Sequence, residues 1–364
     1  MTNQELQSRA IDVMRFPLAV MVVAIHTYFN ESLNLRGTEI PFTGEWAHEL
    51  ITFFSIVLTD AAVPAFFVIS GYLFFMKTIP DDRKKYDWGG YLLKIKRKCL
   101  TLLVPYFMWN LVAFVVEPIH YSKSITEVLT GFYGINGHGP WDGPLWFMRD
   151  LFLMMLIAPA FEWGIKRLKW LLPLALWFIY TSKCFGGNII PGLSYVSLAF
   201  FSIGGYLGIW QKNFIASIRQ YRIMIISLYI VMMIARIVTM NQWGDVTIGA
   251  TTVSLLVDML YIIATIPAWL GIASYIGERT NHLKVWRWLA NSGFVVYAMH
   301  RLFNSKVSAA GLVLLGKPAI SGIEAVTLYF ATIIITVLVC ISTYWVFTRN
   351  MVTEILFLGA RKKR

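Results

Sequence analysis

The sequence predicts an all-α polytopic membrane protein of about ten transmembrane helices, with both termini in the cytoplasm. Of its 364 residues, 57% are hydrophobic and only 14% are charged, whereas a soluble domain carries about 25% charged residues. The apolar residues also fall in long runs, several of them near the roughly 20 residues that a helix needs to cross a bilayer. These observations exclude a soluble enzyme and predict one membrane domain over residues 1–364.

The predicted spans are the apolar runs between polar breaks. The first run contains Asp12, Arg15 and His26, and no small-residue cleavage site follows it. We therefore expect it to stay in the protein as a helix, because a signal peptide has an uninterrupted apolar region. The fifth run is the shortest. In chain order the ten runs lie near residues 10–29, 51–76, 99–119, 144–164, 170–182, 192–210, 223–240, 250–272, 289–304 and 321–346.

Lysines and arginines mark the ends of these spans and collect in alternate loops. The basic breaks are 77–98 after the second span, 166–169 after the fourth, 212–222 after the sixth, 279–287 after the eighth and 349–364 after the tenth. With Arg9, these segments hold 23 of the 32 lysines and arginines, against 5 in the other loops. By the positive-inside rule the richer set is cytoplasmic, which places both termini inside and requires an even number of spans.

The net charge of +12 follows mostly from this topology. Cations beside a membrane attract anionic lipid headgroups, so the lipid bilayer is the expected partner of the basic loops. A nucleic-acid partner is not expected, and neither is a bound metal.

Ten of the ionisable residues inside the predicted spans are singled out, because a charge at the membrane centre costs about 2.5 to 3.5 kcal/mol on insertion scales. Such residues are paired, hydrated or functional. Two structural pairings are open alternatives: Asp12 with Arg15, three residues apart on one helix, and Arg236 with Asp258. The ten residues are Asp12, Arg15, His26, Asp60, Arg149, Asp150, Arg236, Asp258, His300 and Arg301.

Arg15 and His26 lie on one face of the first predicted helix, because eleven residues at about 100° each make three turns plus roughly 20°. The same spacing separates them by about 16 Å along the axis, with Arg15 toward the cytoplasm and His26 near the outer end. One hypothesis is a catalytic track through the membrane. The alternative is that His26 is a hydrogen-bonded packing residue.

The later spans place a group of polar residues toward the outer half of the membrane, where His26 also lies. The predicted topology puts Trp46, Trp141 and Trp243 at or near outer helix ends as well. An aromatic belt explains any one of the tryptophans, whereas the charged group as a whole indicates an outward-facing cavity suited to a sugar. The predicted substrate-binding residues are Trp146, Arg149, Asp150, Arg236, His300 and Arg301. On the inner side, Lys94, Lys96, Arg97 and Lys98 are able to bind phosphates, although positive-inside bias alone also produces such a run.

Several motifs of this chain occur together in one family. Arg15 and His26 are separated by ten residues, and the second span carries an aromatic-rich run, 63–73, that ends in Ser70-Gly71-Tyr72-Leu73. Arg97 precedes Pro105-Tyr106 at the entry to the third span. Weaker patches are Pro144–Phe147, Phe201–Gly208 and Ser292–His300. Over nearly the full chain these motifs resemble the acyltransferase-3 family of bacterial integral membrane O-acyltransferases, of the stand-alone glycan O-acetyltransferase type.

The resemblance implies transfer of an acyl group, most often acetyl, from cytoplasmic acyl-CoA to a hydroxyl of an extracytoplasmic cell-surface glycan or lipid-linked sugar. It implies a location in the bacterial inner membrane, acetyl-CoA as acyl donor, and it leaves a homodimer open. A rival hypothesis is a transporter or exporter of a glycan or small polar solute through the same polar cavity, since intramembrane charges also mark transport pathways.

The residue roles follow from the same chemistry. We expect Arg15, with Lys94, Arg97 and Lys98, to attract the phosphates of the donor. His26 takes the proton of the attacking hydroxyl or carries the acyl group itself, and the sequence leaves both routes open. Ser70 is a candidate donor contact, with helix packing by small residues as its alternative.

Overall fold

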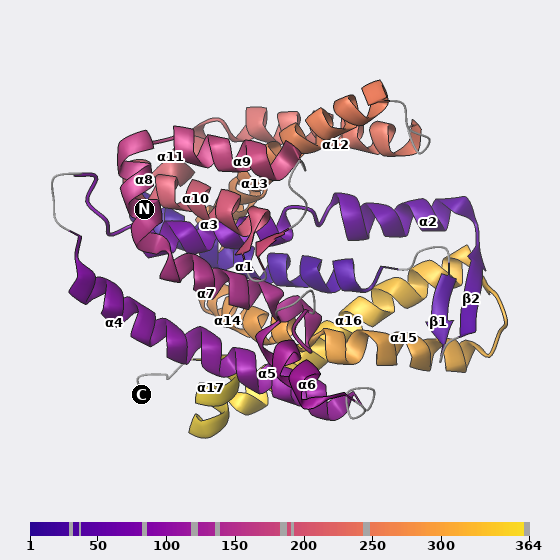
Figure 1. Ribbon diagram of the computed structural model, residues 1–364. Helices are drawn as coiled ribbons and strands as arrows, with labels where there is room; N and C mark the ends of the chain where they lie inside the picture. Colours follow the sequence, from indigo (N-terminus) through magenta and orange to yellow (C-terminus); the bar gives the residue numbers. More distant parts are fainter. Residues whose placement is uncertain are drawn as a thin grey trace.

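The computed structural model describes residues 1–28, 32–35, 38–81, 86–117, 123–134, 139–182, 188–190, 193–242 and 248–359, and most of them are helical (Figure 1). This confirms the all-α membrane class. The helices are α1 Asn3–His26, α2 Glu45–Thr52, η1 Phe53–Val57, α3 Ala62–Phe75, α4 Trp88–Lys98, η2 Cys99–Leu103, α5 Val104–Val116, α6 Ile125–Tyr133, η4 Gly143–Leu145, α7 Trp146–Leu156, α8 Ala158–Leu168, α9 Leu171–Ser182, α10 Tyr195–Trp210, α11 Phe214–Gln220, α12 Arg222–Gln242, α13 Ile248–Arg279, α14 Leu283–Met299, α15 Arg301–Leu315, α16 Gly322–Phe347 and α17 Met351–Leu358.

Short strands join some of these helices, and the sequence did not predict them because each has only a few residues. β1 (Ser32–Leu35) pairs antiparallel with β2 (Thr38–Thr43), which pairs parallel with β5 (Ile320–Ser321). β3 (Asn188–Ile190) pairs antiparallel with β4 (Leu193–Ser194). The β1–β2 hairpin and the turn between α15 and α16 lie at one end of the molecule, and the start of α1, the start of α4 and α17 lie toward the other (Figure 1).

Five helical stretches of the described chain are long and apolar enough to cross a membrane, and a bent pair makes a sixth. The predicted count of ten is therefore not confirmed. The fifth and sixth predicted spans are α9 and α10, which have 12 and 16 residues, fewer than the roughly 20 that cross a bilayer. The five stretches are Glu45–Phe75, Trp88–Val116, Arg222–Met240, Val253–Arg279 and Gly322–Phe347, and the pair is Gly143–Leu156 with Ala158–Leu168.

The bent pair corresponds to the fourth predicted span, which is not one straight helix. Its two helices meet at an angle of 64° around Ile157. Pro159 occupies the second position of α8, where its ring and its missing N–H interrupt the hydrogen-bond ladder of a continuous helix. The bend directs the start of α7 and the end of α8 to different neighbours.

α1 and α14 run side by side in the same direction at the centre of the molecule. Arg287 of α14 pairs with Asp12 of α1, with the Nε and Oδ2 atoms 3.3 Å apart. Further along, Gly293 faces the backbone of Arg15 and Phe16, and the ring of His300 lies beside the ring of His26. The two helices therefore stay in register over their shared length, and this register brings the two histidines together.

The helices α3 and α10 are in close backbone contact with each other. A Cβ atom on Gly71 would overlap the carbonyl oxygen of Phe201, and one on Gly204 would overlap that of Val68. Small residues of this kind let helices in a membrane approach one another closely. The glycines of the second and sixth predicted spans thus position Ser70, which precedes Gly71 on α3.

Candidate functional site

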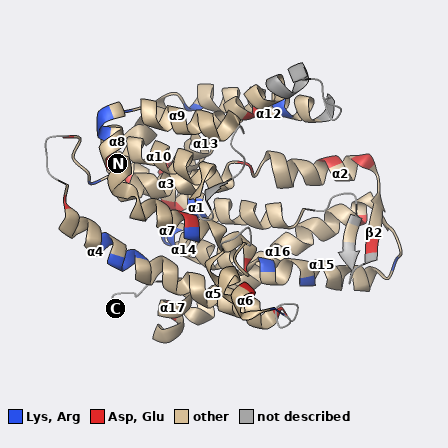
Figure 2. Cartoon of the chain, in the orientation of Figure 1, with Lys and Arg blue, Asp and Glu red and all other residues tan. Residues whose placement is uncertain are grey.

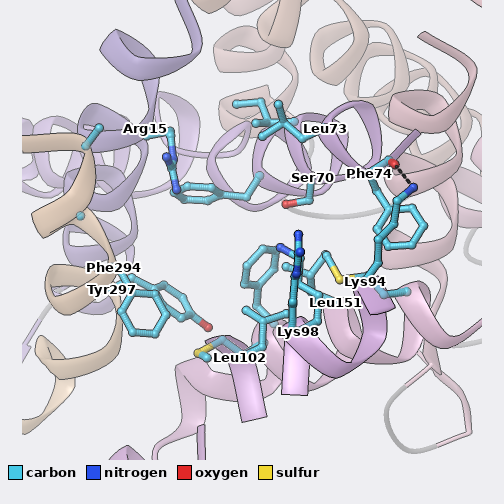
Figure 3. Close-up of a pocket in the computed structure, with 18 of the residues that line it drawn as sticks. Arg15, Ser70, Leu73, Phe74, Lys94, Lys98, Leu102, Leu151, Phe294 and Tyr297 are labelled. Carbon is cyan, nitrogen blue, oxygen red and sulfur yellow. Dashed lines mark hydrogen bonds between the residues drawn. The ribbon is translucent and has the colours of Figure 1, made fainter. Parts of the chain in front are cut away.

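Cations from α1, from α4 and from the turn after α3 surround one large cavity toward the α4 side of the molecule. Its volume is about 460 Å³, and its walls come from α1, α3, α4, α7 and α14. Arg15, Ser70 and Lys98 point into it from different sides (Figure 3). The structure thus brings together all the residues that the sequence predicted for the donor. We name it the donor cavity after the role predicted for these residues. Its polar residues are Arg15, Ser70, Lys77, Lys94, Arg97, Lys98 and Tyr297, and its apolar walls include Phe66, Phe74, Phe147, Met148, Leu151 and Phe294.

The cations of α4 reach the donor cavity because of helical spacing. Lys94, Arg97 and Lys98 are three and four residues apart, which places them on one face of an α-helix. Asp87 caps the start of α4 by accepting a hydrogen bond from the backbone N–H of Gly90 at 2.9 Å. Figure 2 shows the lysines and arginines of α4 as a blue patch toward the end of the molecule where α1 begins.

The charges of the donor cavity are not neutralised by neighbouring carboxylates. Arg15, Lys77, Arg97 and Lys98 have no ion-pair partner in the part of the chain that the structure describes, and no described residue lining the cavity is acidic. Lys94 donates to the carbonyl oxygen of Phe74 at 3.4 Å and lies over its ring. The cavity therefore carries a net positive charge that is available to an anionic ligand.

The alternative in which Asp12 pairs with Arg15 does not occur. Asp12 pairs with Arg287 of α14, and the guanidinium of Arg15 turns into the donor cavity instead. A tertiary contact has replaced the local one because α14 lies against this part of α1. Arg15 is therefore free to bind a ligand.

His26 ends α1, about 16 Å along the helix from Arg15. Its side chain is exposed and does not line the donor cavity. The ring centroids of His26 and His300 are 5.1 Å apart, with the ring planes inclined at 37°. Tyr297, one turn before His300, lines the donor cavity and donates its hydroxyl to the carbonyl oxygen of Pro144. One stretch of α14 thus connects the donor cavity to the histidine pair.

Arg301 lines a second cavity, of about 320 Å³, next to the histidine pair. Among its other lining residues, Lys123 and Glu127 form an ion pair at 3.5 Å, and Trp141 donates its indole N–H to the carbonyl oxygen of Val128 at 3.3 Å. We name it the outer cavity after the predicted topology. It is polar and carries an aromatic side chain. Its described lining residues are Lys123, Glu127, Gly131, Gly139, Pro140, Trp141, Gly143 and Arg301.

Asp142 lies between two residues that line the outer cavity, and sequence reasoning missed it. Its side chain is 1% exposed, and within the described chain neither carboxyl oxygen has a hydrogen-bond donor. Burial raises the pKa of Asp142 to about 8, opposed by the nearby charge of Arg301. Asp142 lies in the connection before Gly143, outside the predicted spans, so the search for charges inside apolar runs did not reach it.

Three other predicted substrate residues tie α7 to its neighbours. Arg149 pairs with Asp150 at 2.9 Å and donates to the carbonyl oxygen of Gly134, and Asp150 accepts a hydrogen bond from the backbone N–H of Ser194 at 3.3 Å. The ring of Trp146 lies 6.4 Å from that of Phe67. None of the three lines the donor cavity or the outer cavity.

Arg236 lies apart from the other predicted substrate residues. It bridges Asp60 at 2.7 Å and Asp258 at 2.5 Å, and it stacks over the ring of Tyr261. A small cavity of about 150 Å³ at this point shares no lining residue with the other two. The structure therefore favours the structural pairing of Arg236 and Asp258. Trp243 lies outside the described residues.

Comparisons with known proteins identify the family. A family model described as an acyltransferase domain, of the acyltransferase-3 type, matches residues 8–345. The succinoglycan biosynthesis protein ExoH of Rhizobium meliloti (strain 1021) is 27% identical over 175 residues, which are 44% of each chain, so the match spans less than half of that relative. No solved structure matches the chain. The family model covers the chain from α1 to α16 and includes both Arg15 and His26, so the resemblance seen in the motifs is confirmed, and the chain belongs to the acyltransferase-3 family.

Proposed function

We propose that the protein is a membrane O-acyltransferase that moves an acyl group, acetyl in the simplest case, from cytoplasmic acyl-CoA to a hydroxyl of an extracytoplasmic glycan or lipid-linked sugar. The observation that carries the proposal is a donor cavity with unneutralised cations beside the same helix that ends in the exposed His26. Membership of the acyltransferase-3 family supports the reaction class. The relative ExoH is named for the biosynthesis of a glycan, which supports a glycan acceptor.

The donor cavity matches the chemistry of coenzyme A in two respects. Five cations line it, and the phosphate groups of coenzyme A are the anions that such side chains bind through charge-assisted hydrogen bonds. Arg15 and Arg97 add the planar fork that suits phosphate. The apolar walls, among them Phe147 and Met148, suit the pantetheine arm, and Ser70 offers it a hydroxyl.

The chemical step uses a lone pair on His26. In one route His26 removes the proton from the sugar hydroxyl while the hydroxyl oxygen attacks the thioester carbonyl carbon. The C–O bond forms, the C–S bond breaks, and the thiolate of coenzyme A takes up the proton. In the other route an imidazole nitrogen of His26 attacks the thioester carbonyl carbon first, so that a C–N bond forms, the C–S bond breaks and the thiolate of coenzyme A leaves. The hydroxyl oxygen of the sugar then attacks the acyl-histidine carbonyl carbon, the C–O bond forms as the C–N bond breaks, and the thiolate takes up the hydroxyl proton. Both routes need an accessible His26, which the structure provides.

The outer cavity is the proposed place of the acceptor. It lies next to the histidine pair through Arg301, and a pyranose ring can stack on Trp141 while charged groups bind its hydroxyls. Because the outer cavity and the donor cavity have different lining residues, donor and acceptor can be bound at the same time.

The direct test is whether the purified protein in detergent hydrolyses acetyl-CoA, and whether His26→Ala abolishes this activity. Losing a positioned general base costs about 10²- to 10⁴-fold in rate. The folding of the variant should be intact because His26 is exposed. His282→Ala is a matched control, since His282 is also exposed but lies at the opposite end of α14. Normal hydrolysis by His26→Ala, or none by the wild type together with glycan export in cells, would favour the transporter instead.

A further inference from the structure

His300 is completely buried at the break between α14 and α15, and one of its ring nitrogens is fixed. Its Nδ1 atom lies 2.8 Å from the carbonyl oxygen of Tyr297 and 3.1 Å from that of Val296. A carbonyl oxygen can only accept a hydrogen bond, so Nδ1 must carry the proton and donate it. In a neutral imidazole this leaves Nε2 without a proton and makes it a hydrogen-bond acceptor.

The Nε2 atom of His300 has no partner among the described residues, although it is fully buried. A buried polar atom without a partner loses its hydrogen bonds to water and gains none in return, so such atoms are uncommon and call for an explanation. Here the neighbouring polar group is the ring of His26, at a centroid distance of 5.1 Å. Because the side chain of His26 is exposed, a small rotation about its side-chain bonds can bring a ring N–H to Nε2 of His300.

Neighbouring contacts keep the two histidines in this arrangement. The side-chain amide of Asn304, one turn after His300, donates to the hydroxyl of Thr27 at 2.9 Å and to the carbonyl oxygen of Val23 at 3.4 Å. These bonds join the start of α15 to the end of α1, next to His26. The position of His300 relative to His26 is therefore set by the backbone of both helices.

We infer that His300 is a positioning residue that accepts a hydrogen bond from the ring N–H of His26. This inference rests on the proposed function. The bond would select the His26 tautomer whose other nitrogen is unprotonated and directed at the reacting groups. When His26 takes a proton or an acyl group, its N–H becomes a stronger donor, and the bond to Nε2 becomes stronger with it. The same bond therefore serves both routes that are open for His26.

Two substitutions separate this role from a structural one, because each keeps only one ring nitrogen. His300→Gln places an acceptor near the position of Nε2 but loses the Nδ1 donor to the backbone. His300→Asn keeps a donor near Nδ1 but places no acceptor near Nε2. We expect His300→Asn to lower kcat for acetyl-CoA hydrolysis about 10- to 100-fold, the usual effect of losing a partner that orients a functional histidine. His300→Gln should lose less, and KM for acetyl-CoA should be unchanged in both.

The opposite order would overturn the inference. If His300 serves only to hold the break between α14 and α15, His300→Asn should be the more active variant, and equal losses in the two variants would also contradict the proposed bond. His282→Asn and His282→Gln are the controls and should resemble the wild type. In a His26→Ala background, His300→Asn should cost nothing further, because a positioning residue acts only through its partner.

A second measurement needs no acyl transfer and so separates failure of this inference from failure of the proposed function. Diethylpyrocarbonate modifies unprotonated imidazole nitrogens, and peptide mass analysis can follow the modification of His26 in the intact protein. We expect slower modification of His26 in His300→Asn than in His300→Gln. If neither variant folds, nitrogen NMR of the histidine-labelled wild type decides: His300 should be protonated at Nδ1, and protonation at Nε2 alone would overturn the inference.

Discussion

Arg15 shows how a tertiary contact decides the role of a single residue. Local spacing offers Asp12 as its partner, three residues earlier on the same helix. In the structure Asp12 instead forms an ion pair with Arg287, which is 275 residues away in the sequence. No pattern within α1 contains that information, since it depends on the register between α1 and α14. The grouping of Arg15 with the cations of α4 was predictable, because the predicted topology puts both on the cytoplasmic side.

We expect Arg15→Ala to weaken the affinity for acetyl-CoA by roughly 10- to 100-fold, the effect of losing hydrogen bonds to a charged group. Arg15→Lys should recover only part of this, because an ammonium keeps the charge but loses the planar fork. Isothermal titration of the purified protein with coenzyme A measures both. Arg349→Ala is the control, since Arg349 is exposed, lies over the ring of Trp345 and is outside the donor cavity. Unchanged donor affinity in Arg15→Ala would assign Arg15 a structural role.

The buried carboxyl group of Asp142 should make the free energy of unfolding depend on pH. Its pKa in the folded protein is about 8, above that of an exposed aspartate, so the folded state holds a proton that the unfolded state releases. The stability that this proton contributes is present at low pH and is lost as the pH rises toward 8. Asparagine cannot ionise. We therefore expect the melting temperature of Asp142→Asn to rise further above that of the wild type as the pH increases from about 5 to about 8. A difference in melting temperature that does not change with pH would mean that the pKa of the Asp142 carboxyl group is not raised in the folded protein.

Among the helices, the contact of α3 with α10 depends on glycine at fixed positions. We expect Gly204→Ala to destabilise the protein by about 1 to 3 kcal/mol, because the added methyl group meets backbone atoms of α3 that cannot move aside. Gly271→Ala is the matched control: a Cβ there makes only ordinary contacts at 3.5 Å, and alanine is the better helix former. Thermal unfolding in detergent measures both variants. A Gly204→Ala protein as stable as Gly271→Ala would show that α3 and α10 are not in backbone contact.

The helices also show where sequence patterns are informative and where they are not. The described residues of every predicted span are mostly helical, because hydropathy depends on local composition. Hydropathy does not report the 64° bend at Ile157, the break at His300 or the short lengths of α9 and α10, which depend on how neighbouring helices pack. The same limit applies to the site. The residues proposed for the donor were predicted from the positions of the cations and from the family motifs, whereas the contact between His26 and His300 follows from the alignment of two helices far apart in the sequence.

For the whole molecule, we propose that both termini face the cytoplasm, as the distribution of lysines and arginines predicts. The start of α1 and α17 lie toward the same end of the molecule, which supports this orientation (Figure 1). Reporter fusions after residue 364 and within 120–143 test it: the first should be active only with a cytoplasmic reporter, the second only with an external one. A C-terminus outside the cell would reverse the placement of His26.

The sidedness of the reaction follows from that orientation. The donor cavity lies beside the basic helix α4, and His26 lies about 16 Å further along α1, a distance that an extended pantetheine arm can cover. The helices satisfy their own backbone hydrogen bonds, so side chains alone can line such a path. In sealed vesicles of known orientation, labelled acetyl-CoA on the cytoplasmic face should therefore acylate a glycan acceptor supplied only to the outer face. His26→Ala vesicles are the control for leakage. Product that forms only when donor and acceptor share one face would contradict transfer through the membrane, even if the reaction class is right.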